Sequence, residues 1–133
     1  MGESDLARHA LTKSIIRCFY EVYNGLGFGF LETHYATALE RELRAAGHSV
    51  AREYAVRLFF KGEELGFHRL DLVVDEAVVI EIKSTPVLHP VARRQLYNYL
   101  RATNLEVGLL LHFGPEPRFM RIFVPSRPVN LGA

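Results

Sequence analysis

Three charged side chains lie inside apolar segments of the chain, where they could carry metal-dependent chemistry. Asp71 lies in Leu-Asp-Leu-Val-Val, and Glu81 and Lys83 lie in Val-Val-Ile-Glu-Ile-Lys. A charged group in a core strand is costly unless it is paired or bound to a metal. Two neighbouring carboxylates repel each other when ionised, and a hard divalent cation relieves that repulsion. Because oxygen ligands favour Mg²⁺ or Mn²⁺ over zinc, we expect one of these two ions.

The same three residues indicate what such a site would do. A bound cation can lower the pKa of a water molecule and stabilise charge on a phosphate. Lys83 follows Glu81 by two residues, which places both on one face of a strand, and its ammonium can position the water or neutralise developing charge. We therefore expect metal-dependent hydrolysis of a phosphodiester. The alternative is that the two carboxylates pair with surface arginines and that Lys83 is solvated at a strand end.

The register of the hairpin between the two strands decides whether the carboxylates meet. A two-residue turn would set Asp71 opposite Ile80, on the wrong face. A three-residue loop over residues 75–77 would set Asp71 directly opposite Glu81. The functional hypothesis requires the second register, or a bulge with the same effect. An unrelated α+β domain with an accidental match would place the two carboxylates on opposite faces of the sheet.

Hydrophobic periodicity predicts the elements that must position these residues. The expected helices run from a cap at Ser4 or Asp5 to Tyr23, from about Leu31 to Ala46, and from about Val91 to Ala102. The expected strands cover residues 49–60, 67–74, 78–83, 105–112 and 119–124. The order ααβββαββ, with a crossover helix after three hairpin-type strands, predicts a mixed sheet with helices packed on it.

Length, composition and charge restrict the class of protein. The chain has 133 residues, 49% of them hydrophobic and 23% charged, which suits one globular domain; we expect it over residues 1–124, with a flexible tail over 125–133. A net charge of +1 argues against a histone-like binder but not against a nuclease. The single cysteine, Cys18, excludes an internal disulfide and a cysteine zinc site. Because we find neither a signal peptide nor a membrane span, we expect a cytoplasmic protein without membrane contact.

The acidic motif and three others resemble a known group of proteins. Asp71 followed by Glu81-Ile82-Lys83 resembles the D…E-x-K signature of the PD-(D/E)XK nuclease superfamily. The other three motifs are Gly29-Phe-Leu-Glu32-Thr-His-Tyr35, Gln95-Leu-Tyr-Asn-Tyr99 and Gly108-Leu-Leu-Leu-His-Phe-Gly114. They resemble, respectively, the naming motif of the GxxExxY family within that superfamily, the QxxxY helix of some of its nucleases, and the closing strand of the GxxExxY family. The resemblance spans about residues 26–122, with the motifs in the right order.

The resemblance implies a fold, an activity and a set of site residues. The fold would be α/β (α+β), a restriction-endonuclease-like mixed sheet flanked by helices. The activity would be Mg²⁺-dependent (or Mn²⁺-dependent) hydrolysis of nucleic acid, which we expect to be DNA. The implied metal ligands are Asp71, Glu81, Glu32 and the carbonyl of Ile82. Lys83 would be the catalytic lysine, and Gln95 and Tyr99 would face the site or the substrate backbone.

Several alternatives remain open at this stage. The same fold could serve as a catalytically silent module that binds nucleic acid or a protein partner, and so small a unit could need a homodimer or another partner to grip DNA. Glu32 could be only a first-turn acid favoured by the helix dipole, Gln95 an exposed helix residue, and Tyr99 a core residue with a wet tip. His68 and Arg69, which flank Asp71, could touch phosphate or be only surface groups. Another phosphate-contacting strip, or only a solvated helix face, could be formed by Arg93, Arg94 and Arg101.

Overall fold

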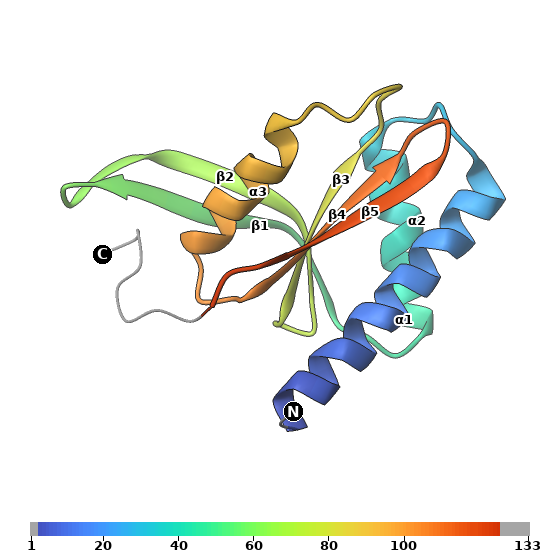
Figure 1. Cartoon of the computed structure of the whole chain (residues 1–133), viewed down its shortest axis with the longest axis horizontal. Coiled ribbons are helices and arrows are strands. Elements are labelled where there is room, and N and C mark those ends of the chain that lie inside the picture. The colour runs from blue at the N-terminus through green and yellow to red at the C-terminus, as the bar shows by residue number, and fades with distance from the viewer. Residues whose placement is uncertain (1–2, 126–133) are drawn as a thin grey trace.

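The computed structural model describes residues 3–125 and contains one mixed sheet with helices on both faces (Figure 1). The helices are α1 (Glu3–Leu26), α2 (Glu32–Ala45) and α3 (Val91–Arg101). The strands are β1 (Val50–Phe60), β2 (Glu63–Val74), β3 (Val78–Lys83), β4 (Val107–Phe113) and β5 (Pro117–Phe123). The predicted class and the order ααβββαββ are confirmed. Residues 126–133, most of the tail expected to be flexible, lie outside the described residues.

The sheet has the order β1-β2-β3-β4-β5, and only the central pair is parallel. β3 and β4 are joined by the α3 crossover and are buried on both faces, except at Lys83. This burial explains why both strands read as continuous apolar runs rather than as alternating patterns. A carboxylate in β3 therefore enters a dry environment whichever face it points to.

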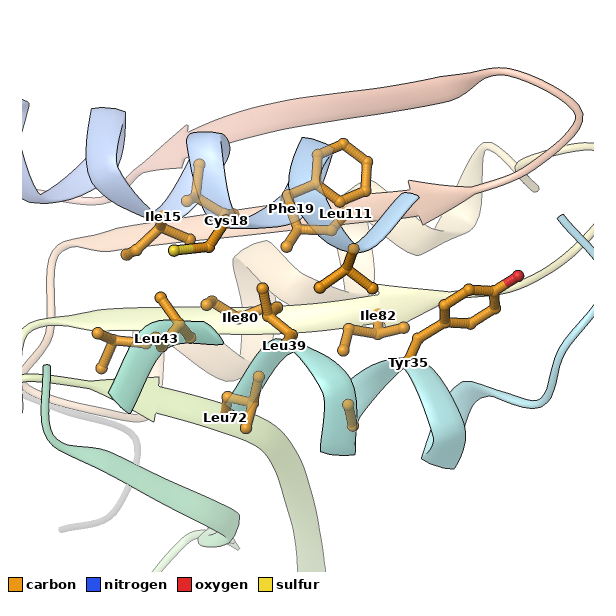
Figure 2. Packing of buried hydrophobic residues seen from close by; sticks show 14 of the residues in the cluster. Ile15, Cys18, Phe19, Tyr35, Leu39, Leu43, Leu72, Ile80, Ile82 and Leu111 are labelled. Carbon is orange, nitrogen blue, oxygen red and sulfur yellow. The ribbon is translucent and has the colours of Figure 1, made fainter. Parts of the chain in front are cut away.

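Two hydrophobic cores lie on the two faces of this sheet. On one face, α1 and α2 cover β3 and β4, and Figure 2 shows Phe19 and Leu39 packing towards Ile80 and Ile82. On the other face α3 contributes the second core, in which Leu96 is buried with strand residues. The two layers fix β3 between them and thereby fix the positions of the side chains at its end.

The strands β1 and β2 change faces part of the way along their length. Leu72 belongs to the first core and Leu70 to the second, although two residues apart on a regular strand would share a face. Opposite Asp71, Glu53 interrupts the pairing of β1 with β2 and has a φ of 50°, a strained value for a residue with a side chain. The reversal therefore occurs at Asp71, and the outer half of the hairpin extends past α3 (Figure 1).

The start of β2 differs from the sequence-based prediction. We expected a four-residue turn and a strand beginning at Phe67, but β2 begins at Glu63 and pairs with Phe60. Lys61 and Gly62, with φ of 50° and 80°, form the two-residue turn whose twist matches the flanking strands. The prediction placed the start of the strand too late because the tip of the hairpin is polar, and polar residues next to a glycine are typical of a loop.

None of the described helices is both long enough and apolar enough to cross a membrane.

Candidate active site

Asp71 and Glu81 face each other where β2 and β3 separate. The pairs Val74↔Val78 and Leu72↔Ile80 leave a three-residue loop between the strands. The backbone pairing ends there, and the next residues in that register are Asp71 and Glu81. Within that loop, Ala77 N donates to Val74 O at 3.0 Å, and residues 75 and 76 have φ of 52° and 54°. The register is the one that the functional hypothesis required, and the two-residue alternative is wrong.

Each carboxylate takes the place of a backbone partner in the strand pairing. The backbone N–H of Asp71 donates to Glu81 Oε1 at 3.0 Å, and the backbone N–H of Ile82 donates to Asp71 Oδ2 at 2.6 Å. Within residues 3–125, no hydrogen bond reaches the second oxygen of either group, Asp71 Oδ1 or Glu81 Oε2. Two strands thus separate around two carboxylates that each keep one oxygen available.

Burial makes it costly to ionise both carboxylates. Glu81 is 7% exposed, and burial followed by the charge of Asp71 raises its pKa to about 8, against the opposing effects of an Asp71 hydrogen bond and Lys83. Burial also raises the pKa of Asp71, although the hydrogen bond from Ile82 and the charge of Lys83 oppose the change. The pair therefore lacks positive charge, which a cation would supply.

Glu32 and Lys83 act on this pair through their charges. The charge of Lys83 lowers the pKa of both carboxyls, and the charge of Glu32 raises both. Glu32 occupies the first turn of α2, and its Oε2 accepts a hydrogen bond from Ser84 N, just beyond the end of β3, at 3.1 Å. The structure thus brings Glu32 to the edge of the site without a hydrogen bond to either acid, and its role as a ligand stays a prediction.

Residues of α3 form the other wall of the site. Gln95 and Tyr99 line a cavity of about 190 Å³ together with Glu81 and Lys83. Their spacing of four residues puts them on one face of the helix, as the sequence predicted. The amide of Ile82 donates to Asp71 Oδ2, and the role of its carbonyl as a metal ligand stays a prediction.

His68 is the site residue that the sequence analysis undervalued. Its ring stacks on Tyr99 with centroids 3.8 Å apart and an interplanar angle of 5°. Its Nε2 lies 3.6 Å from Glu81 Oε2 and is buried without a hydrogen-bond partner among the described residues. Burial, followed by the charge of Lys83, lowers the pKa of His68, which favours the neutral ring.

Geometry explains why the strand pattern alone does not place His68 beside Glu81. His68 lies three positions before Asp71, and on a regular strand an odd spacing points two side chains to opposite faces. The reversal of faces at Asp71 brings His68 back to the side of Glu81. The signal lies in the strained backbone of Glu53 on the neighbouring strand, which the sequence does not reveal.

The donor set fits a divalent cation in its chemistry, although the ligands are not gathered in advance. Among residues 3–125, no group of three or more His, Cys, Asp or Glu side chains is arranged to hold a metal ion. Two carboxylates with an available oxygen each, and the partnerless nitrogen of His68, are nevertheless the donor types that bind such ions. The raised pKa of Glu81 is a second sign that a positive charge would be favourable here.

Comparisons with known proteins bear on the family and the fold of the chain. A family model described as PD-(D/E)XK nuclease superfamily matches residues 9–122. Two chains of known structure match, and one titled "Crystal structure of SSO0001" has a TM-score of 0.55 and 22% identity over 69% of this chain and 49% of that one. This chain thus spans about half the length of that structure, and the likeness shows the fold alone. A comparison with curated proteins found no match.

Proposed function

The chain belongs to the PD-(D/E)XK nuclease superfamily, and on that premise we propose that it hydrolyses phosphodiester bonds of nucleic acid with Mg²⁺ or Mn²⁺. The observation that carries the proposal is the pairing of Asp71 with Glu81 where β2 and β3 separate, with one oxygen of each available. A buried acid pair of this kind lowers the stability of the fold, so its presence suggests that it serves binding or catalysis. We propose that the substrate is DNA. We also propose that residues 1–124 form the single domain that acts on it.

Within the superfamily, we propose that the chain belongs to the GxxExxY family. The support is the role of Tyr35, whose hydroxyl donates to Gly27 O at 2.5 Å and accepts from Phe30 N at 3.2 Å. These two hydrogen bonds fold the glycine-containing segment that leads into α2. They thereby set the position of Glu32, the acid of the same motif, at the end of β3.

The residues of the site divide the work of hydrolysis among them. A bound divalent cation would supply Lewis acidity and an activated water. Asp71, Glu81, Glu32 and the carbonyl of Ile82 would hold it, with His68 beside Glu81. The ammonium of Lys83 neutralises charge that develops on the phosphate as the water attacks. Gln95 and Tyr99 contact the substrate backbone, and Tyr99 also keeps the ring of His68 in place.

Cleavage assays with two matched aspartate variants test this function. Labelled DNA and RNA oligonucleotides would be incubated with the purified chain and Mg²⁺, Mn²⁺ or EDTA. We expect Asp71→Asn to reduce cleavage about 10³-fold, the scale of losing a group that stabilises the transition state. Asp75→Asn is the matched control because Asp75 lies in the turn between β2 and β3, away from Glu81. Undiminished cleavage by Asp71→Asn protein would refute the proposal.

A second candidate function is a catalytically silent module that binds nucleic acid or a protein partner, alone or as a homodimer. It is favoured by the lack, among residues 3–125, of a ready-made group of three metal-binding side chains. Tight nucleic-acid or partner binding together with no measurable Mg²⁺ or Mn²⁺ binding would select this function over catalysis.

A further inference from the structure

A groove of about 800 Å³ opens beside the candidate active site, and the proposed function does not use it. It lies where β3 and β4 end, between the loop that enters α3 and the turn that joins β4 to β5. Lys83 pairs with His112 across the parallel strands, so the catalytic lysine and a residue of the groove are direct neighbours. Neighbouring strands are about 4.8 Å apart, so the groove lies close to the cavity of the site, although the two share no lining residue.

His112 is the most deeply buried residue of the groove and is held in one orientation. It is 4% exposed, and its Nε2 donates to the carbonyl oxygen of Thr85 at 2.8 Å. Because a carbonyl only accepts, Nε2 carries a proton, and in the tautomer with that single proton Nδ1 is an acceptor. Nδ1 is buried without a hydrogen-bond partner among the described residues.

Gly114 shows that the chain makes room for this ring. A Cβ at Gly114 would come within 2.5 Å of Cε1 of His112, so any other residue would displace the imidazole. A buried acceptor with no partner is unfavourable, and a ring kept in that state at a groove is a feature of binding sites. An occupant of the groove would satisfy this acceptor if it brought an N–H or O–H donor to Nδ1 and displaced what now covers that atom.

The walls of the groove add an apolar surface and a positive charge. Val87, Leu88, Met120 and three prolines line it, and Val87 is 77% exposed. Arg93 and Arg118 are its cations. Arg118 is paired with Glu116 at 3.1 Å, whereas Arg93 makes no ion pair or side-chain hydrogen bond with any described residue. A fitting ligand thus has an apolar body, a hydrogen-bond donor and a negative charge.

We propose that the groove binds one unpaired nucleotide of the substrate strand, next to the phosphate that is cleaved. The base lies between the proline and aliphatic side chains with a donor edge towards His112, and its phosphate lies at Arg93. Enzymes that read an extruded base use such stacking together with edge hydrogen bonds. This inference rests on the proposed function and specifies its substrate: single-stranded or flapped nucleic acid, since a paired base must first leave its stack.

Binding of abasic oligonucleotides tests the inference without any cleavage. The full-length Asp71→Asn protein would be titrated, by fluorescence anisotropy, with single-stranded DNA in which one abasic nucleotide is moved along the strand. Stacking of one base is worth about a tenfold change in affinity or more. We expect a loss of that size at one or two adjacent positions, and weaker binding of the fully paired duplex.

Variants of the groove separate its contribution from general charge. Arg93→Ala, added to Asp71→Asn, should weaken single-strand binding severalfold. Arg94→Ala is the matched control, because Arg94 lies over the ring of Tyr97 and outside the groove, and it should change little. Met120→Trp, which fills the groove from β5, should abolish the difference between the abasic and the intact strand.

The possible outcomes distinguish this inference from the function on which it rests. An abasic penalty at defined positions that Met120→Trp or Arg93→Ala removes supports the nucleotide site. Equal affinity for every abasic strand, or for duplex and single strand, overturns the nucleotide site while leaving the nuclease proposal in place. The absence of any binding to DNA or RNA overturns both.

Discussion

Two groups of polar side chains are built around aspartates four positions apart, Asp71 and Asp75, and their environments are opposite. At the turn between β2 and β3, Asp75 accepts hydrogen bonds from Ser49 N at 2.8 Å and from His48 Nδ1 at 2.7 Å. The other nitrogen of His48 lies 2.8 Å from Ser14 Oγ. We call Ser14, His48, Ser49 and Asp75 the clasp, because they join α1, the start of β1 and the turn. The second group is the acid pair, Asp71 and Glu81.

The two groups differ in how many donors each carboxylate receives. In the clasp, burial raises the pKa of Asp75, but the hydrogen bonds from His48 and Ser49 outweigh it and lower the pKa below its ordinary value. In the acid pair, burial and mutual repulsion prevail, and the pKa of Glu81 rises to about 8. The comparison indicates that the clasp stabilises the fold, whereas the acid pair keeps binding capacity for a ligand at a cost in stability.

The largest expected difference between the two groups is in catalysis. Glu81→Gln removes a charge that the proposed reaction needs, so we expect cleavage of DNA in Mg²⁺ to fall about 10²- to 10³-fold. Asp75→Asn changes the same kind of group in the clasp, and cleavage should stay within about twofold of the unaltered protein. Equal losses of initial rate in the two variants would show that the groups do not differ in function.

For stability we expect the opposite order, with the larger loss from a change in the clasp. Asp75→Ala leaves Ser49 N and His48 without their acceptor and places alanine at a φ of 52°, so we expect a loss of about 2–3 kcal/mol in the free energy of unfolding. Asp75→Asn tolerates that backbone and keeps an acceptor, so it should lose only about 1 kcal/mol. Urea unfolding at pH 7 measures both values, and a stability equal to that of the unaltered chain would contradict the role given to the clasp.

In the metal-free protein, Glu81→Gln should increase stability rather than reduce it. The folded pKa of Glu81, about 8, lies above its ordinary value of 4.5, so the folded chain binds the additional proton between these values. Stability therefore falls as pH rises from about 5 to 8. Glutamine does not ionise, so we expect this decline to flatten and the variant to gain about 1–2 kcal/mol at pH 8 in EDTA. Parallel pH profiles for the two proteins would contradict the account.

The clasp should show the opposite dependence on pH. Because the folded pKa of Asp75 lies below its ordinary value of 3.8, its stabilisation is present above that pH and is lost on acidification through the folded pKa. Between pH 5 and 2.5, the melting temperature of Asp75→Asn should therefore fall less steeply with decreasing pH than that of the unaltered chain. We expect a smaller change in pH dependence from Asp75→Asn than from Glu81→Gln, since the side chain of Asp75 is 36% exposed and solvent screens its charge.

Much of the site could be predicted from the sequence, because local patterns encode it. Alternation located β3 and reduced the hairpin register to two choices, and the observed pairing is the one that sets Asp71 against Glu81. The parts that could not be predicted depend on contacts between distant segments. The reversal of faces at Asp71 brings in His68, and the clasp needs Ser14 and Asp75 to meet across 61 residues of sequence.

The groove illustrates the same limit. His112 carried no spacing that would indicate a ligand, and its role emerges only from its bond to Thr85, the absent side chain of Gly114 and the nearby Arg93. These features come from a loop, a turn and a helix that no sequence pattern connects. Motifs that lie on one strand can be predicted from the sequence, whereas sites assembled from several loops cannot.

The most direct test of the central claim, that the acid pair holds a divalent cation, is calorimetric titration of the metal-free protein with Mn²⁺ and Mg²⁺ at pH 7. Running it in two buffers of different ionisation enthalpy also counts the protons released. With the pKa of Glu81 at about 8, we predict binding with release of about one proton per ion, and no such release in Glu81→Gln. Binding that Asp71→Asn leaves unchanged, or no binding at all, would contradict the claim.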